Sequence, residues 1–261
     1  MGGPVSARRP RIVMLCDDGA SSRYLYNALA GESAVLAVVI ERRPSAKAMI
    51  RHRARLLGWP AVSGQLAFIA FNKLLARFQQ RRSDELIRRY GLQDAAPPAG
   101  ITHRVESVNT AAVRRLLRKL DPDAVVVNGT RIVSAKVLDC IRRPFLNTHA
   151  GITPRYRGVH GGYWALVQDD AANCGVTVHL VDPGVDTGGV LYQQRIAVER
   201  SDGFNTYPLH QLAAGIPLMK QALRDVLHGT LASRDGVAPS ALWYHPTLTQ
   251  YLRYRLTRSV R

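Results

Sequence analysis

Short runs of apolar residues recur along this chain, and most are followed by a turn and a segment with helical periodicity. The runs at 11–16, 34–41 and 124–128 are rich in β-branched residues and lack polar alternation, which is typical of parallel strands buried on both faces. Further strands are expected at 145–147, 176–181 and 190–198, and helices at 24–29, 110–120, 163–168 and 204–228. The pattern predicts an α/β fold: a Rossmann-like, mostly parallel sheet with helices on both faces.

One long segment departs from this alternation. From residue 42 to about 91 no strand pattern occurs, while Phe68, Phe71, Leu75 and Phe78 recur at helical spacing. We therefore expect a helical insertion at about 44–100, containing one or two helices and closed by the loop at 94–100. The chain then divides into a main α/β domain at 11–200, which holds the insertion, and a helical, basic C-terminal region at 201–261.

The positive charge of the chain is concentrated outside the α/β core. The net charge is +17, and Lys and Arg outnumber Asp and Glu by twelve to two between residues 42 and 89. The tail at 253–261 adds four arginines and no acid. This distribution favours an anionic partner, and a merely solubilised helical surface is the alternative. The apolar stripe of the insertion likewise fits peripheral membrane contact or a partner's groove, or else packing on the sheet or on the second subunit of a homodimer.

Composition excludes several classes. No apolar run reaches the length of a membrane-spanning helix. Residues 1–10 contain arginines but no apolar core leading to a cleavage site, so we expect no signal peptide. Cys16, Cys140 and Cys174 lack metal-ligand spacing, which predicts thiols in the reducing cytoplasm and no metal site.

An amide, an imidazole and a carboxylate occur within 40 residues, each beside turn residues at a predicted strand end. Asn147 and His149 are two positions apart, so in an extended segment they point to the same side. Asp186 lies between Gly184 and Gly188, which allow sharp bends. The amide and a protonated ring can donate to a developing oxyanion, and the carboxylate can manage protons, as acyl transfer to an amine requires. The alternative is local hydrogen bonding of each side chain within its own turn.

The order of these motifs carries a family resemblance. The chain has Asn-x-His at 147–149, Pro-x-aromatic-Arg-Gly at 154–158, Gly-Val-Thr-x-His at 175–179 and Asp-x-Gly at 186–188. This series resembles the formyltransferases that use 10-formyltetrahydrofolate, which include enzymes acting on glycinamide ribonucleotide, methionyl-tRNA and sugars. The likeness is densest at 121–194 and is absent from about 44 to 100. It implies the formyltransferase fold, and a catalytic domain over 11–200.

The resemblance also implies roles for individual residues. Asn147 and His149 would stabilise the oxyanion, and Asp186 would tune the ring and relay a proton through water. The co-substrate 10-formyltetrahydrofolate would be bound by Arg131, Ile132, Val133, Val181, Asp182 and Gly184. On the acceptor side it implies Gly19, Ser21, Ser22, Arg157 and His179. The first three partly match a phosphate-binding turn, with Asp17 and Asp18 placing negative charge beside it. Arg157 either binds an acceptor anion or braces its loop, and His179 either serves the site or packs beneath it.

The sequence does not identify the amine that would accept the formyl group. The 75 residues after Asp186 are fewer than we expect for a tRNA-binding appendage, so a small, anionic amine such as an amino sugar nucleotide or a secondary metabolite is favoured over nucleic acid. Glycinamide ribonucleotide is the next choice. A catalytically silent relative that binds an anionic partner, and a deacylase that uses water as acceptor, are the rival functions.

Overall fold

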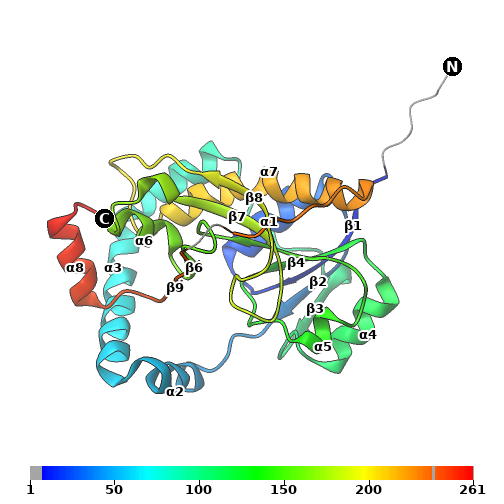
Figure 1. Cartoon of the computed structure of the whole chain (residues 1–261), viewed down its shortest axis with the longest axis horizontal. Coiled ribbons are helices and arrows are strands. Elements are labelled where there is room, and N and C mark those ends of the chain that lie inside the picture. The colour runs from blue at the N-terminus through cyan, green and yellow to red at the C-terminus, as the bar shows by residue number, and fades with distance from the viewer. Residues whose placement is uncertain (1–7, 237–238, 261) are drawn as a thin grey trace.

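The computed structural model describes residues 8–236 and 239–260 (Figure 1). Residues 1–7, 237–238 and 261 lie outside the described part. Most of the N-terminal segment considered above as a leader, and Arg261 of the basic tail, therefore fall outside it.

A seven-stranded sheet forms the centre of the molecule, in the order β3-β2-β1-β4-β5-β7-β8. Neighbouring strands from β3 to β5 in this order pair in parallel. Strand β7 pairs antiparallel with both of its neighbours, β5 and β8. The strands are β1 (Arg11–Cys16), β2 (Ala34–Glu41), β3 (Thr102–Val105), β4 (Ala124–Asn128), β5 (Phe145–His149), β7 (Gly175–Leu180) and β8 (Val190–Arg195). The predicted α/β class with a mostly parallel sheet is confirmed.

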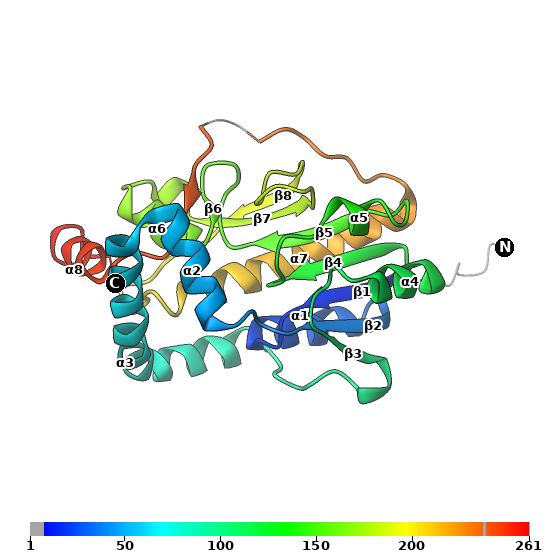
Figure 2. The ribbon, with the colours of Figure 1, turned by 90° about the horizontal axis from the view of Figure 1, so that it is seen from below.

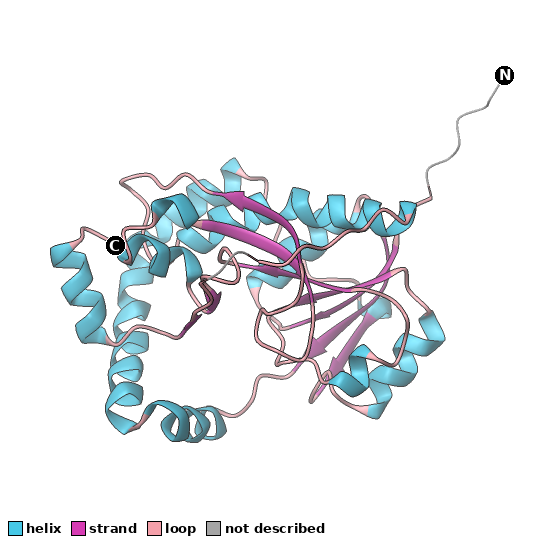
Figure 3. Cartoon of the chain, viewed as in Figure 1, coloured by secondary structure: helices cyan, strands magenta, loops and turns pink. Residues whose placement is uncertain are grey.

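Helices cover both faces of this sheet (Figures 1 and 3). Side chains alternate between the two faces along β1. Ile12 and Met14 pack towards α1 (Ala20–Ala30) and α7 (Tyr207–His228), while Val13 and Leu15 pack towards α4 (Ala111–Leu120) and α5 (Ala135–Leu138). This is why the strand has no polar side. The helices are α1 (Ala20–Ala30), α4 (Ala111–Leu120), α5 (Ala135–Leu138), α6 (Gly161–Val167), α7 (Tyr207–His228) and α8 (Leu248–Thr257). None of the helices in the described ranges combines the length and apolar character needed to cross a membrane.

Three small features differ from the sequence interpretation. Strand β3 was not expected, because its sequence Thr-His-Arg-Val forms a half-exposed edge without an apolar run. Helix α1 begins at Ala20, so Ser21 and Ser22 lie in its first turn and not in a preceding loop. A second sheet pairs β6 (Arg157–Gly158) with β9 (Leu242–Trp243), which brings the C-terminal segment to the motif loop.

The insertion consists of α2 (Ala46–Leu57) and α3 (Trp59–Arg89), joined at Gly58, whose φ of +81° suits glycine. Figures 1 and 2 both show the pair beside the sheet, at the end away from α4. Its apolar stripe packs within the chain: Phe68 lies 4.8 Å from Phe204 and 5.1 Å from Tyr251, between ring centroids. Phe78, at the end of the stripe, is 78% exposed. Intramolecular packing thus accounts for most of the stripe.

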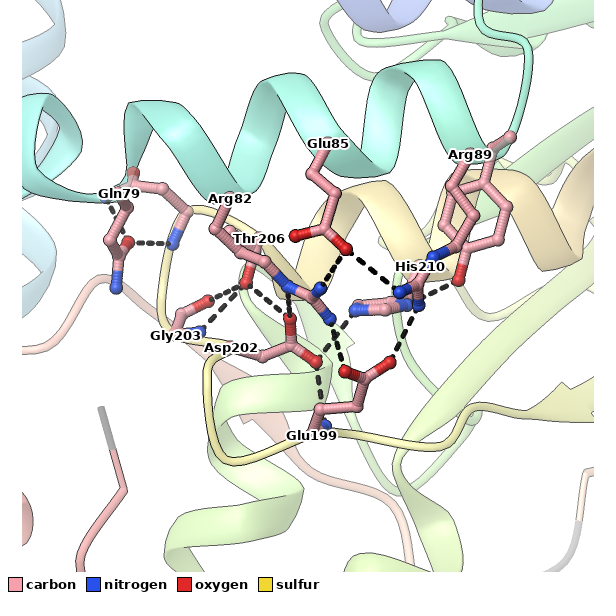
Figure 4. A network of polar contacts seen from close by, with 11 residues as sticks. Gln79, Arg82, Glu85, Arg89, Glu199, Asp202, Gly203, Thr206 and His210 are labelled. Atoms are coloured by element: carbon pink, nitrogen blue, oxygen red, sulfur yellow. Dashed lines mark hydrogen bonds and ion pairs between the residues drawn. The ribbon is translucent and has the colours of Figure 1, made fainter.

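A charged network fixes the C-terminal half of α3 (Figure 4). Arg82 donates from Nε to Asp202 Oδ1 over 2.8 Å, and its Nη2 forms an ion pair with Glu199 Oε2 at 2.9 Å. Asp202 is fully buried and also contacts His210 Nε2 of α7 at 2.8 Å. The network therefore joins the insertion to α7 through the loop that precedes it.

Candidate active site

A cavity of about 590 Å³ opens at the carboxyl ends of β4 and β5. The strand order reverses between β1 and β4, and the residues that follow these two strands, Asp17 and Gly129, both line the cavity. Open parallel sheets bind ligands at such a reversal. The cavity thus occupies the position where the fold favours a binding site.

His149 and Asp186 meet at this cavity. His149 ends β5, and its Nδ1 lies 3.2 Å from Asp186 Oδ2. Its Nε2 donates to the Tyr156 carbonyl oxygen over 2.7 Å. Both side chains are largely buried, at 6% and 14% exposure. Two acceptors therefore face the two nitrogens of one ring, an arrangement that a doubly protonated ring satisfies fully.

Asn147 and His179 complete the polar cluster. They are register partners on β5 and β7, and the Asn147 amide donates to His179 Nε2 over 3.1 Å. Asp186 Oδ1 lies 3.5 Å from the same amide nitrogen and 3.6 Å from His179 Nε2. His179 Nδ1 donates to the Leu180 carbonyl, which leaves Nε2 to face Asn147 and Asp186. The structure brings the three predicted catalytic residues and His179 together.

The backbone around Asp186 holds its carboxylate in place. Asp186 has a φ of +50°, in the left-handed region that Asp adopts more readily than most residues. The Gly158 N–H donates to its Oδ2 over 2.9 Å, and Arg157 Nη1 donates to the Val185 carbonyl over 3.0 Å. Arg157 thus braces the loop that carries Asp186, and it is absent from the residues that line the cavity.

The environment sets the charge of these groups. Burial alone would raise the pKa of Asp186, but the nearby His179 ring, the charge of His149 and the Gly158 N–H outweigh it and lower the pKa to about 2. Burial lowers the pKa of His149, while Asp186 acts in the opposite direction. Asp186 is therefore ionised at neutral pH, whereas the pKa of His149 lies below its ordinary value because the effect of burial exceeds that of Asp186.

The residues expected to bind the co-substrate form another part of the wall. Arg131, Ile132, Val133, Val181, Asp182 and Gly184 all line the cavity. The loop after β4 is fixed by Glu41, which is buried and accepts from Arg131 N over 2.8 Å. Ile132 is 55% exposed, so an apolar side chain is presented to the opening. In the described part of the chain, no group of His, Cys, Asp and Glu is arranged to hold a metal ion.

The turn at Gly19–Ser22 is occupied by a side chain of the protein itself. Gly19 N and Ser22 Oγ donate to Asp17 Oδ1 over 3.0 and 2.7 Å, and Gly19, Ser21 and Ser22 do not line the cavity. A substrate phosphate that used these donors would have to displace the Asp17 carboxylate. The sequence places Asp17 beside the turn but does not predict that it accepts hydrogen bonds from the turn.

Several lining residues were not identified from the sequence. Arg43, Pro44, Met49 and Arg53, from the start of the insertion and from α2, reach the cavity. The signal available in the sequence was the cluster of basic residues after residue 42. That signal could not show which of the arginines faces inwards.

Comparisons with known proteins bear on the family and the fold. A family model described as Formyl transferase matches residues 12–216. The methionyl-tRNA formyltransferase of Caldanaerobacter subterraneus subsp. tengcongensis is 31% identical over 137 residues, which cover 51% of this chain and 43% of that protein. The chain thus spans less than half the length of this curated relative.

Solved structures match a larger share of the chain. Glycinamide ribonucleotide transformylase 1 from Symbiobacterium toebii has a TM-score of 0.56 and 18% identity, covering 88% of this chain and 95% of that one. A sugar N-formyltransferase from a Shewanella species has a TM-score of 0.53 and 12% identity, covering 90% and 76%. At these identities the likeness shows a shared fold.

Proposed function

Because the chain belongs to the formyl transferase family, we propose that it transfers a formyl group from 10-formyltetrahydrofolate to a primary amine of a small acceptor. The observation that carries this proposal is the meeting of Asn147, His149 and Asp186 at one cavity, although 39 residues separate the first from the last. An amide, an imidazole and an ionised carboxylate in contact form the set that amine acylation needs.

The cavity suits a folate co-substrate in size and chemistry. Its volume of about 590 Å³ falls in the usual range for small-molecule sites, about 300–1,000 Å³. Ile132, Val133 and Val181 would contact the apolar faces of the ring, and backbone groups of the loops after β4 and β7 would bind its polar edge. When bound, 10-formyltetrahydrofolate supplies the activated formyl group.

Asn147 and His149 would stabilise the negative charge that develops on the formyl oxygen. The Asn147 amide would donate to that oxygen directly. Burial disfavours the charged form of His149, and negative charge developing in the cavity would add to that of Asp186 and favour it. We propose that the ring takes up its second proton from the attacking amine, through water, as the oxyanion forms, because both ring nitrogens already face acceptors.

Asp186 would direct proton movement rather than keep the proton. A carboxyl group with a pKa of about 2 is a weak base at neutral pH, so a proton from the attacking amine would pass on to water. The carboxylate would also orient His149 and His179, which both contact it. Arg157 has a positioning role in this proposal, through the Val185 carbonyl.

For the acceptor, we propose a small anionic amine such as an amino sugar nucleotide or a secondary-metabolite amine, with glycinamide ribonucleotide as the alternative. Arg53 lines the cavity without a carboxylate partner in the described ranges, which supports an anionic acceptor. A cytoplasmic location is part of the proposal, since all three cysteines are free thiols. Membrane contact through the insertion and homodimer formation stay predictions.

The test is a transfer assay with purified protein, 10-formyltetrahydrofolate and a panel of primary amines, with formylated product detected by mass spectrometry. We expect Asn147→Ala, His149→Ala and Asp186→Ala each to lower turnover by a factor on the order of 10² to 10⁴. His103→Ala is the matched control, because His103 is exposed on the edge strand β3. Wild-type rates in all three variants would contradict the proposal, and formate release without an amine would indicate a deacylase instead.

A further inference from the structure

Helix α2 of the insertion contributes one wall of the proposed active site. Met49 and Arg53 are one helical turn apart, so they lie on the same face of α2, and both line the cavity. Lys47, Arg51 and Arg55 of the same helix are exposed and do not line it. Helix α2 therefore directs one of its three arginines at the site and leaves the other two towards solvent.

The carboxylates of the cavity wall are already bound. Asp17 pairs with Arg43 Nη2 at 3.0 Å, and Glu41 pairs with Arg131 Nε at 3.1 Å. Asp186 is held by His149 and His179, as described above. Asp182 accepts from Thr187 Oγ1 and Gly184 N. Within the described ranges, none of these carboxylates forms an ion pair with Arg53, the remaining arginine of the wall.

Arg53 is half-buried, and its side chain makes no hydrogen bond or ion pair with any residue of the ranges 8–236 and 239–260. Burial lowers the pKa of its guanidinium, because a charge removed from water without a counter-ion is unfavourable. A bound anion would supply the missing interaction.

The groups beside Arg53 do not supply a counter-charge. The His160 and His245 rings contact each other at 2.8 Å between Nε2 and Nδ1. Burial lowers the pKa of His160 to about 3 and that of His245 to about 4, and the Arg53 charge contributes to both shifts. Both rings are neutral at pH 7, so neither carries a charge that could offset that of Arg53.

We propose that Arg53 binds an anionic group of the amine acceptor, a phosphate or a carboxylate, and so positions the amine for formyl transfer. This inference rests on the proposed function and assigns the acceptor class: an amine that carries an anion. A guanidinium forms paired hydrogen bonds with either group, which fixes orientation as well as position. Arg43, held by Asp17 at the same wall, lies where it can support a larger anion such as a diphosphate.

The inference is tested first by anion binding without folate or turnover. Inorganic phosphate, pyrophosphate and glutarate are titrated by calorimetry into the whole protein at low salt, which separates phosphate from carboxylate recognition. We expect Arg53→Gln to raise the Kd of the preferred anion at least about tenfold, the loss of one charge-assisted pair, and Arg55→Gln to leave it unchanged. Equal losses in both variants would indicate diffuse attraction to a basic surface and overturn the inference, as would wild-type binding by Arg53→Gln.

A second measurement separates this inference from the proposed function. A non-reactive folate analogue should bind Arg53→Gln as tightly as wild type, and weaker binding would place Arg53 on the co-substrate side and overturn the inference. In transfer assays, Arg53→Gln should raise KM for a phosphorylated amine but not for its unphosphorylated counterpart. If anion binding depends on Arg53 and no amine is formylated, the anion site stands and the proposed function fails.

Discussion

Replacing Asp186 by Asn conserves the shape of the side chain and removes its charge. The Gly158 N–H and the His149 ring face Oδ2, and the Asn147 amide and the His179 ring face Oδ1. An Asn side chain has one accepting oxygen and one donating nitrogen. If its oxygen stays on the Gly158 N–H, its nitrogen faces the Asn147 amide, so two donors oppose each other at the centre of the cluster.

The stability effect follows from the pKa of Asp186. The folded value of about 2 lies below the ordinary 3.8, so the ionised group stabilises the folded state. Each pKa unit corresponds to about 1.4 kcal/mol, which makes the contribution about 2 kcal/mol at pH 7. Because the folded pKa is lowered, this contribution is present above pH 4 and is lost as the pH falls towards 2. We therefore expect Asp186→Asn to be about 2 kcal/mol less stable at pH 7.

Three assays check this prediction. Urea unfolding at pH 7 gives the stability difference, the transfer assay gives the rate, and an NMR titration follows the His149 ring. Since Asp186 raises the pKa of His149, the variant should lower that pKa, and turnover should fall at least about a hundredfold. Wild-type stability together with wild-type turnover would refute the role that the contacts assign to this carboxylate.

Two further predictions concern regions away from the reacting groups. Because His160 and His245 have folded pKa values of about 3 and about 4, below their ordinary 6.5, they stabilise the fold above pH 6.5 and this stabilisation is lost as the pH falls. By pH 5, each ring accounts for a loss of about 2 kcal/mol of folding stability. The variant His245→Asn should therefore lose less stability than wild type between pH 7 and pH 5, measured by urea unfolding. Equal losses in the two proteins would contradict this prediction. Arg82→Ala leaves the buried carboxylate of Asp202 without its arginine and should cost about 3–5 kcal/mol, measured against the exposed control Arg81→Ala, whose equal destabilisation would argue against the network.

Local signals predicted six of the seven strands of the sheet and the shared orientation of Asn147 and His149, whereas the role of Asp186 beside them was implied by the family resemblance. Asn147 and His149 could be placed in one pocket because their spacing in a strand puts them on one side, and the strand ends at a favoured position of the fold. Strand β3 was missed because pairing with β2, rather than an apolar run, makes it a strand.

Contacts between distant segments were beyond the sequence. One local contact was also not predicted: Asp17 accepts from Gly19 N and Ser22 Oγ, two and five positions away, because the chain bends after β1. The inward direction of Arg53 depends on how α2 is docked, which the periodicity of α2 itself does not contain. The role of the apolar stripe likewise depended on Tyr251, which lies 183 positions beyond Phe68 and completes its packing.

Helix α3 is attached to the body of the protein along much of its length, by Phe68 in its first half and by Arg82 in its second half. Both attachments lie outside the residues that line the cavity. Helix α3 therefore holds α2 beside the cavity without contributing a residue to the cavity wall. If Arg53 selects the acceptor, changes along one short helix could redirect the enzyme to a different amine, while the machinery on the sheet stayed the same.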